Sequence, residues 1–325
     1  MGHFVSTSAA EKAKVDESVA NFVLGVKLPF RVVEHPLFIA MVDRLHPGYK
    51  PPTRKSISNT HLDNTYTKLQ SKMKSELEGK TVTMQQDGWS TPANEPVIST
   101  SVTCDGVGYF VDAQLTGSKS KTAEACQEML TESKAFAEKT FGCKVRSVVT
   151  DNAPAMAKMR AGLEEDNQDL ITYGCLAHHL NLIMKDINDA KLPECVEKIQ
   201  RHFCNKHIPT ALLADFKESV RPRVSADTRW SSQLDCYDTY IKNRSCMISI
   251  IQEHPGVIEK SIQTAIMDNN LYFKVVEMVK ILRPISVALL RAQVDSTSLA
   301  DGYDIMNRLM ADPAVAPVHD KIKKR

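Results

Sequence analysis

Residues 96–104 alternate between two sets of small and β-branched side chains. This period of two is the pattern of a strand with two different faces. Asp105-Gly106-Val107-Gly108 follows and leads into the β-prone run Tyr109-Phe110-Val111. A Gly-containing connector between two such runs predicts a β-hairpin. The centre of this chain is therefore expected to contain antiparallel sheet.

Other β-prone and helical runs surround this hairpin. Thr81-Val82-Thr83-Met84 precedes it, and short apolar runs that favour strands follow at 145–150 and 171–173. Helical patterns occupy 121–140, 153–165 and 176–190. Three meandering strands followed by alternating helices and strands predict an α/β fold, built on a mixed sheet with flanking helices.

These patterns divide the chain into four regions. Residues 1–15 are polar and loose, and 16–80 are expected to be mostly helical, with prolines separating the helices. Residues 81–190 form the predicted mixed sheet. From 191 to 325 the β signal disappears and helix follows helix. A chain of 325 residues suits about two domains.

The composition is that of a soluble globular protein, with 42% hydrophobic and 25% charged residues. No segment approaches the roughly 20 apolar residues of a membrane span, so no membrane partner is expected. The formal net charge is +2, so a nucleic acid would have to bind a local patch. The stretch from Lys50 to Lys74 carries six cations against the single acid Asp63. It suits either a solvated helix face or a phosphate-binding surface.

The eight cysteines are scattered and include no CxxC pair. The polar N-terminus shows no signal peptide, so reduced thiols and the cell interior are favoured. Cys175 and His178 are three residues apart on a predicted helix, and Cys204 and His207 repeat that spacing. The order differs from that of the usual zinc fingers, so structural zinc is not expected.

Two carboxylates each follow a β-prone run. Asp87 lies in Gln85-Gln86-Asp87-Gly88-Trp89-Ser90, and Asp151 lies in Thr150-Asp151-Asn152-Ala153. If their strands are neighbours, both side chains meet at one edge of the sheet. Carboxylates are ligands that Mg²⁺ prefers, and a metal pair would stabilise the attacking and leaving oxygens of a phosphodiester.

Each carboxylate also has an ordinary structural interpretation. Asp-Gly at 87–88 is a common turn pair, and Asp151 is well placed to cap the helix that follows it. A further motif, Thr228-Arg229-Trp230, contains one of the two tryptophans. Such an Arg-Trp pair can contact a phosphate and stack on a base, although a Trp at the start of a helix is often a core residue.

Together and in this order, the motifs resemble the hAT transposase superfamily, and more narrowly its branch of BED zinc-finger and domesticated-transposase proteins. The resemblance covers about residues 25–312. Further segments carry it: Leu28-Pro29-Phe30, Glu34-His35-Pro36-Leu37-Phe38, Pro51-Pro52-Thr53-Arg54, Cys175-Leu176-Ala177-His178-His179-Leu180-Asn181-Leu182 and Leu282-Arg283-Pro284-Ile285.

The resemblance implies an RNase H-like fold with an all-helical domain inserted before its last catalytic element. It implies that Asp87 and Asp151 are the first two catalytic and metal-binding carboxylates of a metal-dependent DNA cleavage and strand-transfer reaction. It also implies four residues that handle transposon-end DNA: Cys175, His178, Arg229 and Trp230.

Two parts of the family pattern are missing from this sequence. No cysteine pair precedes residue 104, where a BED finger would lie. The third carboxylate, a Glu beyond the insertion, and the C-terminal dimerisation region would follow Arg325. We therefore expect a truncated insertion domain and an incomplete core, with apolar surface exposed near Leu309 and Met310.

The expected function is that of a transposase-derived nuclear protein that binds DNA or protein partners, including a second copy, without catalysis. Mg²⁺ would bind weakly for want of a third carboxylate. The alternative is an active metal-dependent transposase or an RNase H-like nuclease, in which Glu124 or Glu128 supplies the third acid. The basic end, 321–325, suits nuclear import or simple solvation.

Overall fold

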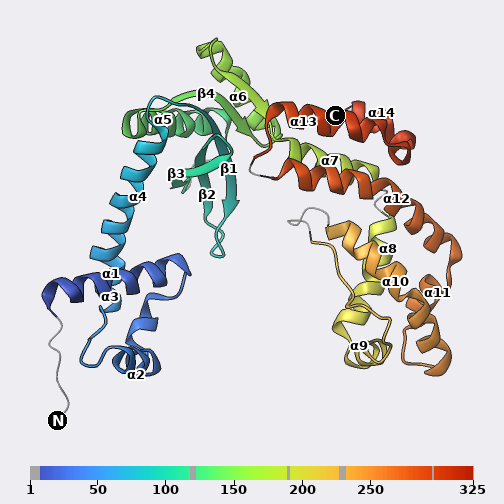
Figure 1. The fold of residues 1–325 in the computed structure, drawn as a ribbon. Coiled ribbons are helices and arrows are strands. Elements are labelled where there is room, and N and C mark those ends of the chain that lie inside the picture. The colour runs from blue at the N-terminus through green and yellow to red at the C-terminus, as the bar shows by residue number, and fades with distance from the viewer. Residues whose placement is uncertain (1–7, 118–121, 189–190, 227–231, 295, 325) are drawn as a thin grey trace. The chain divides into compact units, whose positions relative to one another are not determined.

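The structure is a computed structural model that describes residues 8–117, 122–188, 191–226, 232–294 and 296–324 (Figure 1). These residues pack as two compact units. The first contains the chain up to Thr81 together with Ala135–Lys144, and the second contains Val82–Lys134 and everything from Val145 onward. In the described ranges, no helix is long and apolar enough to cross a bilayer.

Up to Leu77 the first unit consists of helices and their connecting loops, and it also includes Thr81 and Lys144, the first residues of two strands. Its core contains Val23, Val33 and Ile57, all buried. Thr53 follows two prolines and accepts a hydrogen bond from the Ser56 N–H, which starts the third helix. The elements are α1 (Ala9–Gly25), η1 (Phe30–Glu34), α2 (Pro36–Leu45), α3 (Arg54–Ser56), η2 (Ile57–His61) and α4 (Leu62–Leu77).

A five-stranded mixed sheet forms the centre of the fold, in the order β3-β2-β1-β4-β5 (Figure 1). β1 pairs antiparallel with β2, and β2 with β3, whereas β4 and β5 are parallel. An antiparallel meander joined at its first strand to two further strands confirms the predicted RNase H-like mixed sheet. The strands are β1 (Thr81–Ser90), β2 (Pro96–Cys104), β3 (Val107–Leu115), β4 (Lys144–Thr150) and β5 (Ile171–Gly174).

The predicted hairpin joins β2 and β3 through a turn of only two residues. Asp105 and Gly106 have φ angles of 51° and 78°. Two left-handed residues make the turn that matches the natural twist of paired strands. Val107 pairs with Cys104, so β3 begins inside the segment 105–108 that the sequence predicts as the connector.

β1 is longer than predicted, and this moves Asp87 into the interior of a strand. The sequence predicts a β run over 81–84 with Asp87 at the end of its strand, and it leaves a turn at Asp87-Gly88 as the alternative, but β1 continues to Ser90. Asp87 pairs with Ser99 and Gly88 with Ile98. Cross-strand pairing therefore overrides the turn preference of the Asp-Gly pair, and the placement of Asp87 at a strand end is wrong.

The first part of helix α5 (Ala123–Phe141) lies against one face of the sheet. From it, the buried Ser133 donates to the Asp112 Oδ2 at 2.7 Å and lies 3.3 Å from the Thr100 hydroxyl. Asp112 and Thr100 are register partners on β3 and β2. This face thus combines apolar packing with a buried polar row, which Gln86 on β1 extends as the partner of Thr100.

Two helices follow β4 and β5, and the rest of the second unit is helical. α6 (Pro154–Asp166) follows β4 and α7 (Leu176–Ile187) follows β5. α7 packs along α12, and its Leu180 and Ile183 belong to the core of the helical region. The remaining elements are α8 (Lys191–Asn205), α9 (His207–Ala214), α10 (Ser232–Glu253), α11 (Lys260–Met267), α12 (Asn269–Ala292), α13 (Leu299–Ala311), η3 (Pro313–Val318) and α14 (His319–Lys323).

Near Leu309, Val287 of α12 is 46% exposed, so apolar surface is present there. Leu309 is buried at 3% exposure, because α13 packs it against the helical core. Large apolar side chains are also exposed on the sheet, where Trp89, Phe110 and Leu115 are 46%, 61% and 63% exposed. The sheet face opposite α5 is therefore the one that lacks a covering layer within the described residues.

Candidate functional site

Two hydrogen bonds show how β1 and β4 run beside each other. The hydroxyls of Thr83 and Ser147 are 2.7 Å apart, and the Lys144 N–H donates to the Lys80 carbonyl at 2.8 Å. In both pairs the second residue is 64 positions further along the chain. Because the partners advance together, β1 and β4 are parallel.

This pairing brings the two predicted carboxylates to one end of the sheet. Asp87 comes four residues after Thr83, and Asp151 comes four residues after Ser147. The even spacing keeps Thr83 and Asp87 on one face of β1, and Asp151 is the first residue after β4. Since the strands are neighbours, the condition for convergence of the two carboxylates is met.

Asp87 is exposed on the uncovered face of the sheet. Its Oδ1 accepts a hydrogen bond from the Gly88 N–H at 2.8 Å. Trp89 lies two residues further on, so its half-exposed ring is on the same face. The Asp87 carboxylate is therefore open to a ligand and lies beside an aromatic surface.

Asp151 lies in the loop directly after β4, as predicted. Its Oδ1 accepts the Ala153 N–H at 2.8 Å, and Pro154 then starts α6. This contact is an Asx turn before the helix and not the helix cap that the sequence left open for Asp151, because the N-cap residue of α6 is Ala153 and no side chain caps it. It occupies one carboxylate oxygen, so a structural role and a ligand-binding role are compatible.

Arg160 of α6 holds the Asp151 loop through hydrogen bonds. No sequence pattern indicated this residue's role. Its Nη1 donates to the Thr150 hydroxyl at 2.6 Å and to the Asp151 carbonyl at 2.7 Å. Burial lowers the pKa of the Arg160 guanidinium, and the nearby charge of Asp151 opposes that shift. No motif marks Arg160, nine residues away from Asp151.

Asn152 ties the same loop to the start of α7. Its Nδ2 donates to the Cys175 carbonyl at 2.8 Å, and the Cys175 N–H donates to the Thr150 carbonyl at 2.7 Å. The Asn152 Oδ1 lies so close to Gly174 that a Cβ there would be 1.8 Å from it. Gly174 is therefore required because Asn152 fills the space that a side chain would need.

Two of the predicted DNA-contacting residues lie next to this loop. Cys175 is the residue before α7, and His178 lies in the first turn of that helix. Both are partly exposed. Cys175 is thus linked through Asn152 to the Asp151 loop, whereas Arg229 and Trp230 lie outside the described residues.

The acids considered as a third metal ligand lie on α5. Glu124 is exposed and forms an ion pair with Lys158 of α6 at 2.6 Å. The hydrogen bond from Lys158 is the main cause of the lowered pKa of the Glu124 carboxyl. Glu128 is exposed one turn further along the helix. Across the residues that the structure describes, no group of three or more His, Cys, Asp or Glu side chains could hold a metal ion.

Two other sequence features can now be placed. The Cys204 thiol donates to the Pro222 carbonyl at 3.4 Å, and burial raises its pKa. In the basic stretch 50–74, Lys68 forms an ion pair with Glu17, and Lys72 one with Glu76. Part of the charge of that stretch is therefore balanced by acids of the same unit.

One protein-family model matches part of this chain. Residues 52–202 match a protein family described as Domain of unknown function (DUF659). The match spans both Asp87 and Asp151, as well as Cys175 and His178. No curated protein is similar enough to this sequence to count as a relative.

Among solved structures, the chain is similar to one described as the Drosophila P element transposase strand transfer complex. The identity is 12% and the TM-score is 0.34, over 99% of this chain and 81% of that one. So distant a likeness decides nothing about the site, and the fold rests on the strand order and pairing described above.

Proposed function

We propose that this chain is a transposase-related protein of the hAT type that binds DNA in the nucleus without cutting it. The observation that carries the proposal is the parallel pairing of β1 and β4, which brings Asp87 and Asp151 to one end of an RNase H-like sheet. Both lie within the DUF659 match. The resemblance of the surrounding motifs to hAT transposases supports the assignment to DNA.

Binding without cleavage follows from the acids around this end of the sheet. Phosphodiester cleavage with two metals needs ligands that hold both ions. Glu124, a candidate for the third acid, is paired with Lys158. We infer that Asp87 and Asp151 hold Mg²⁺ weakly, and that Cys175 and His178 contribute to the DNA-binding surface next to them.

The alternative function is that of an active metal-dependent nuclease or transposase. The observation that favours it is the position of Glu128, which is exposed on α5, the helix after β3. An acid on this helix could complete the ligand set if the helix and the sheet end came together around a metal.

One experiment separates the two functions. The full chain is incubated with labelled duplex DNA and with an RNA–DNA hybrid in Mg²⁺ or Mn²⁺, and binding is followed by fluorescence anisotropy at several salt concentrations. The proposal expects salt-sensitive DNA binding and uncut substrate. An Asp151→Asn variant should bind DNA at least as well, because it removes a negative charge near the phosphates. Glu165→Gln, an exposed acid of α6, is the matched control.

The outcomes that oppose the proposal are distinct. Cleavage that is lost in Asp151→Asn but kept in Glu165→Gln would establish the nuclease instead. Loss of cleavage in Glu128→Gln as well would identify the third acid. Failure of the full chain to bind DNA would refute the proposal itself.

Weak metal binding has its own measurement. Because a ligand that binds only the folded state raises its stability, millimolar Mg²⁺ should change the melting temperature little, and EDTA should have no effect. A large upward shift with Mg²⁺ that disappears in Asp87→Asn would show a complete metal site.

A further inference from the structure

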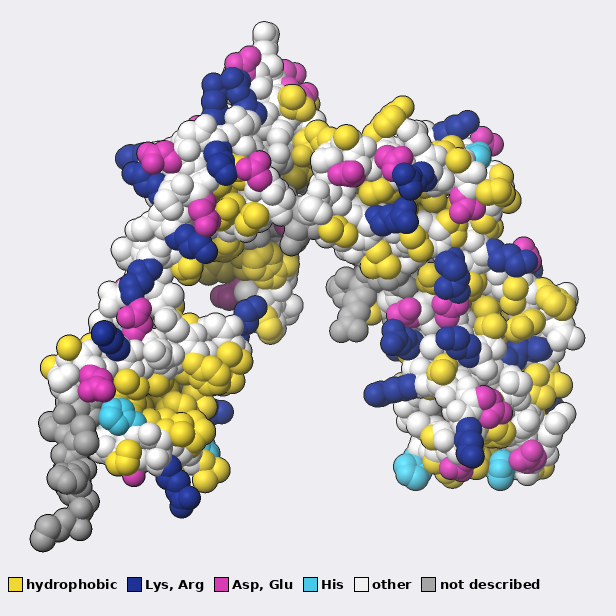
Figure 2. Space-filling model, in the orientation of Figure 1, with side chains coloured by type: hydrophobic (Ala, Val, Ile, Leu, Met, Phe, Trp, Pro, Cys, Tyr) yellow, Lys and Arg dark blue, Asp and Glu magenta, His cyan; other side chains and the backbone are white. Residues whose placement is uncertain are grey.

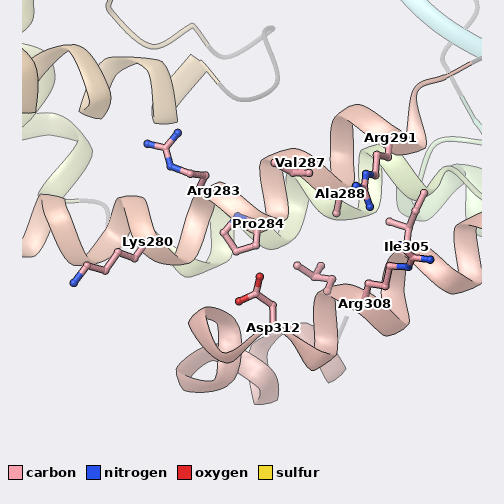
Figure 3. Close-up of a pocket in the computed structure, with 10 residues that line it drawn as sticks. Lys280, Arg283, Pro284, Val287, Ala288, Arg291, Ile305, Arg308 and Asp312 are labelled. Carbon is pink, nitrogen blue, oxygen red and sulfur yellow. The ribbon is translucent and has the colours of Figure 1, made fainter.

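A groove between α12 and α13 combines an apolar floor with cations around it (Figure 3). It has a volume of about 330 Å³. Its floor comes from Pro284, Val287 and Ala288 of α12 and from Ile305 and Leu309 of α13. All of these residues belong to one packed region, because α12 and α13 lie against each other.

The cations of the groove outnumber its acids. Lys280, Arg283, Arg291 and Arg308 line it, and Asp312 is the single carboxylate among the lining residues. Asp312 is already engaged, since its Oδ1 accepts the Ala314 N–H at 2.9 Å and starts η3. Among the residues that line the groove, positive charge therefore exceeds negative charge.

Three of these cations have acidic partners, and those partners lie outside the groove lining. Lys280 pairs with Glu277, Arg283 with Asp238, and Arg308 with Asp304. Each cation is more than half exposed. Exposed ion pairs of this kind are weak and exchange partners readily. Arg291 has no ion-pair partner among the described residues.

The apolar floor continues along α12 beyond the groove. Val287 and Leu290 are 46% and 57% exposed and lie three residues apart on α12. Figure 2 shows hydrophobic side chains interleaved with Lys and Arg over this region. A DNA backbone would leave such side chains uncovered, so the surface suits a partner that is itself apolar and acidic.

We propose that the α12–α13 groove binds an acidic amphipathic helix of a partner protein. Apolar side chains along one face of that helix would cover Val287, Leu290 and the groove floor, and its flanking carboxylates would pair with Arg291 and Arg308. Helices bind grooves in this way through anchors at spacings of three and four residues. This inference goes beyond the proposed DNA binding and does not depend on Asp87 or Asp151.

The test uses the full chain and a fluorescein-labelled synthetic peptide. The peptide places leucines at i, i+3, i+4 and i+7 and glutamates between them, and a second peptide has the same composition in scrambled order. Fluorescence anisotropy should show that the amphipathic peptide binds at least tenfold more tightly than the scrambled one. Arg291→Glu combined with Arg308→Glu should weaken binding at least tenfold, and Val287→Asp should do the same by placing a charge on the apolar floor.

Controls keep the result specific to the groove. Arg44→Glu changes the charge of an exposed arginine in the first unit and should leave peptide binding unchanged. Circular dichroism should show that all variants remain folded, as expected for exposed positions. A peptide with lysine in place of glutamate should bind the double arginine variant better than it binds the unaltered protein.

Four results would overturn the proposal. These are no binding of the amphipathic peptide at 100-fold excess, equal binding of the scrambled peptide, an equal loss in Arg44→Glu, and a charge swap without rescue. If the double arginine variant lost binding to duplex DNA but kept peptide binding, the groove would be a nucleic-acid surface. Failure of the DNA-binding proposal would show instead in the unaltered chain with DNA and would leave the peptide result standing.

Discussion

Gly174→Ala should disturb the Asp151 loop through a single contact. The new Cβ would lie 1.8 Å from the Asn152 Oδ1 and 2.9 Å from its Cγ. Neither distance is tolerable, so the Asn152 side chain must rotate away. That rotation breaks the hydrogen bond from its Nδ2 to the Cys175 carbonyl.

The loss of unfolding free energy caused by this rotation depends on the hydrogen-bond partners that Asn152 leaves. The Cys175 carbonyl keeps a donor, because the His179 N–H also bonds to it at 3.0 Å. The loss therefore falls on the Asn152 amide, which is only partly buried and can still reach water. One lost hydrogen bond, partly compensated by water, corresponds to about 1–2 kcal/mol of unfolding free energy.

A double-mutant cycle measures whether this contact is the cause. Asn152→Ala alone should cost about 1 kcal/mol for the lost hydrogen bond. In the double variant the clash is gone, so Gly174→Ala should add almost nothing to that cost, a clear departure from additivity. Urea unfolding followed by circular dichroism gives the four values. Additive costs, or a Gly174→Ala cost under about 0.5 kcal/mol, would refute the reasoning.

Three further substitutions test other parts of the molecule. Arg160→Ala should lower unfolding stability by about 2–3 kcal/mol, because two hydrogen bonds from a charged donor to Thr150 and Asp151 are lost; a urea-unfolding cost below about 0.5 kcal/mol would contradict this. Gln86→Met should raise the melting temperature, since both amide atoms of the buried Gln86 lack partners within the described structure; a lower melting temperature would show that the amide is satisfied. Burial and the charge of Lys206 lower the pKa of His202, so the stability linked to its neutral form is present above the unfolded pKa of about 6.5 and is lost as pH falls below it. In urea titrations from pH 7 to 5, His202→Leu should flatten that fall, and an unchanged slope would exclude His202 as its source.

Much of the sheet could be predicted from the sequence because its strands have simple signals. The alternation over 96–104 and the short apolar runs before Asp151 and at 171–173 all became strands. The extension of β1 through Asp87 and Gly88 could not be predicted. Local preference at Asp-Gly favours a turn, and the strand is held by partners on β2 that the local sequence does not reveal.

The residues that hold the Asp151 loop in place were harder to predict from the sequence than the two carboxylates. Asp87 and Asp151 stand in recognisable motifs, but Arg160 acts from nine residues away in a helix with no motif of its own. Gly174 gives only the weak signal of a glycine at a strand end. Its reason, the amide of Asn152 lying over it, depends on two segments that meet only in the folded chain.

The two carboxylates are held by different kinds of structure. Asp87 belongs to a strand that is hydrogen-bonded into the sheet, whereas Asp151 sits on a loop positioned by the side chains of Arg160 and Asn152. The distance between the two carboxylates therefore depends on a strand fixed by backbone pairing at Asp87 and on a loop held by side chains at Asp151. Substitutions at 152 or 160 would therefore move Asp151 while the paired strand keeps Asp87 in place, so the distance between the two carboxylates can change without loss of the sheet.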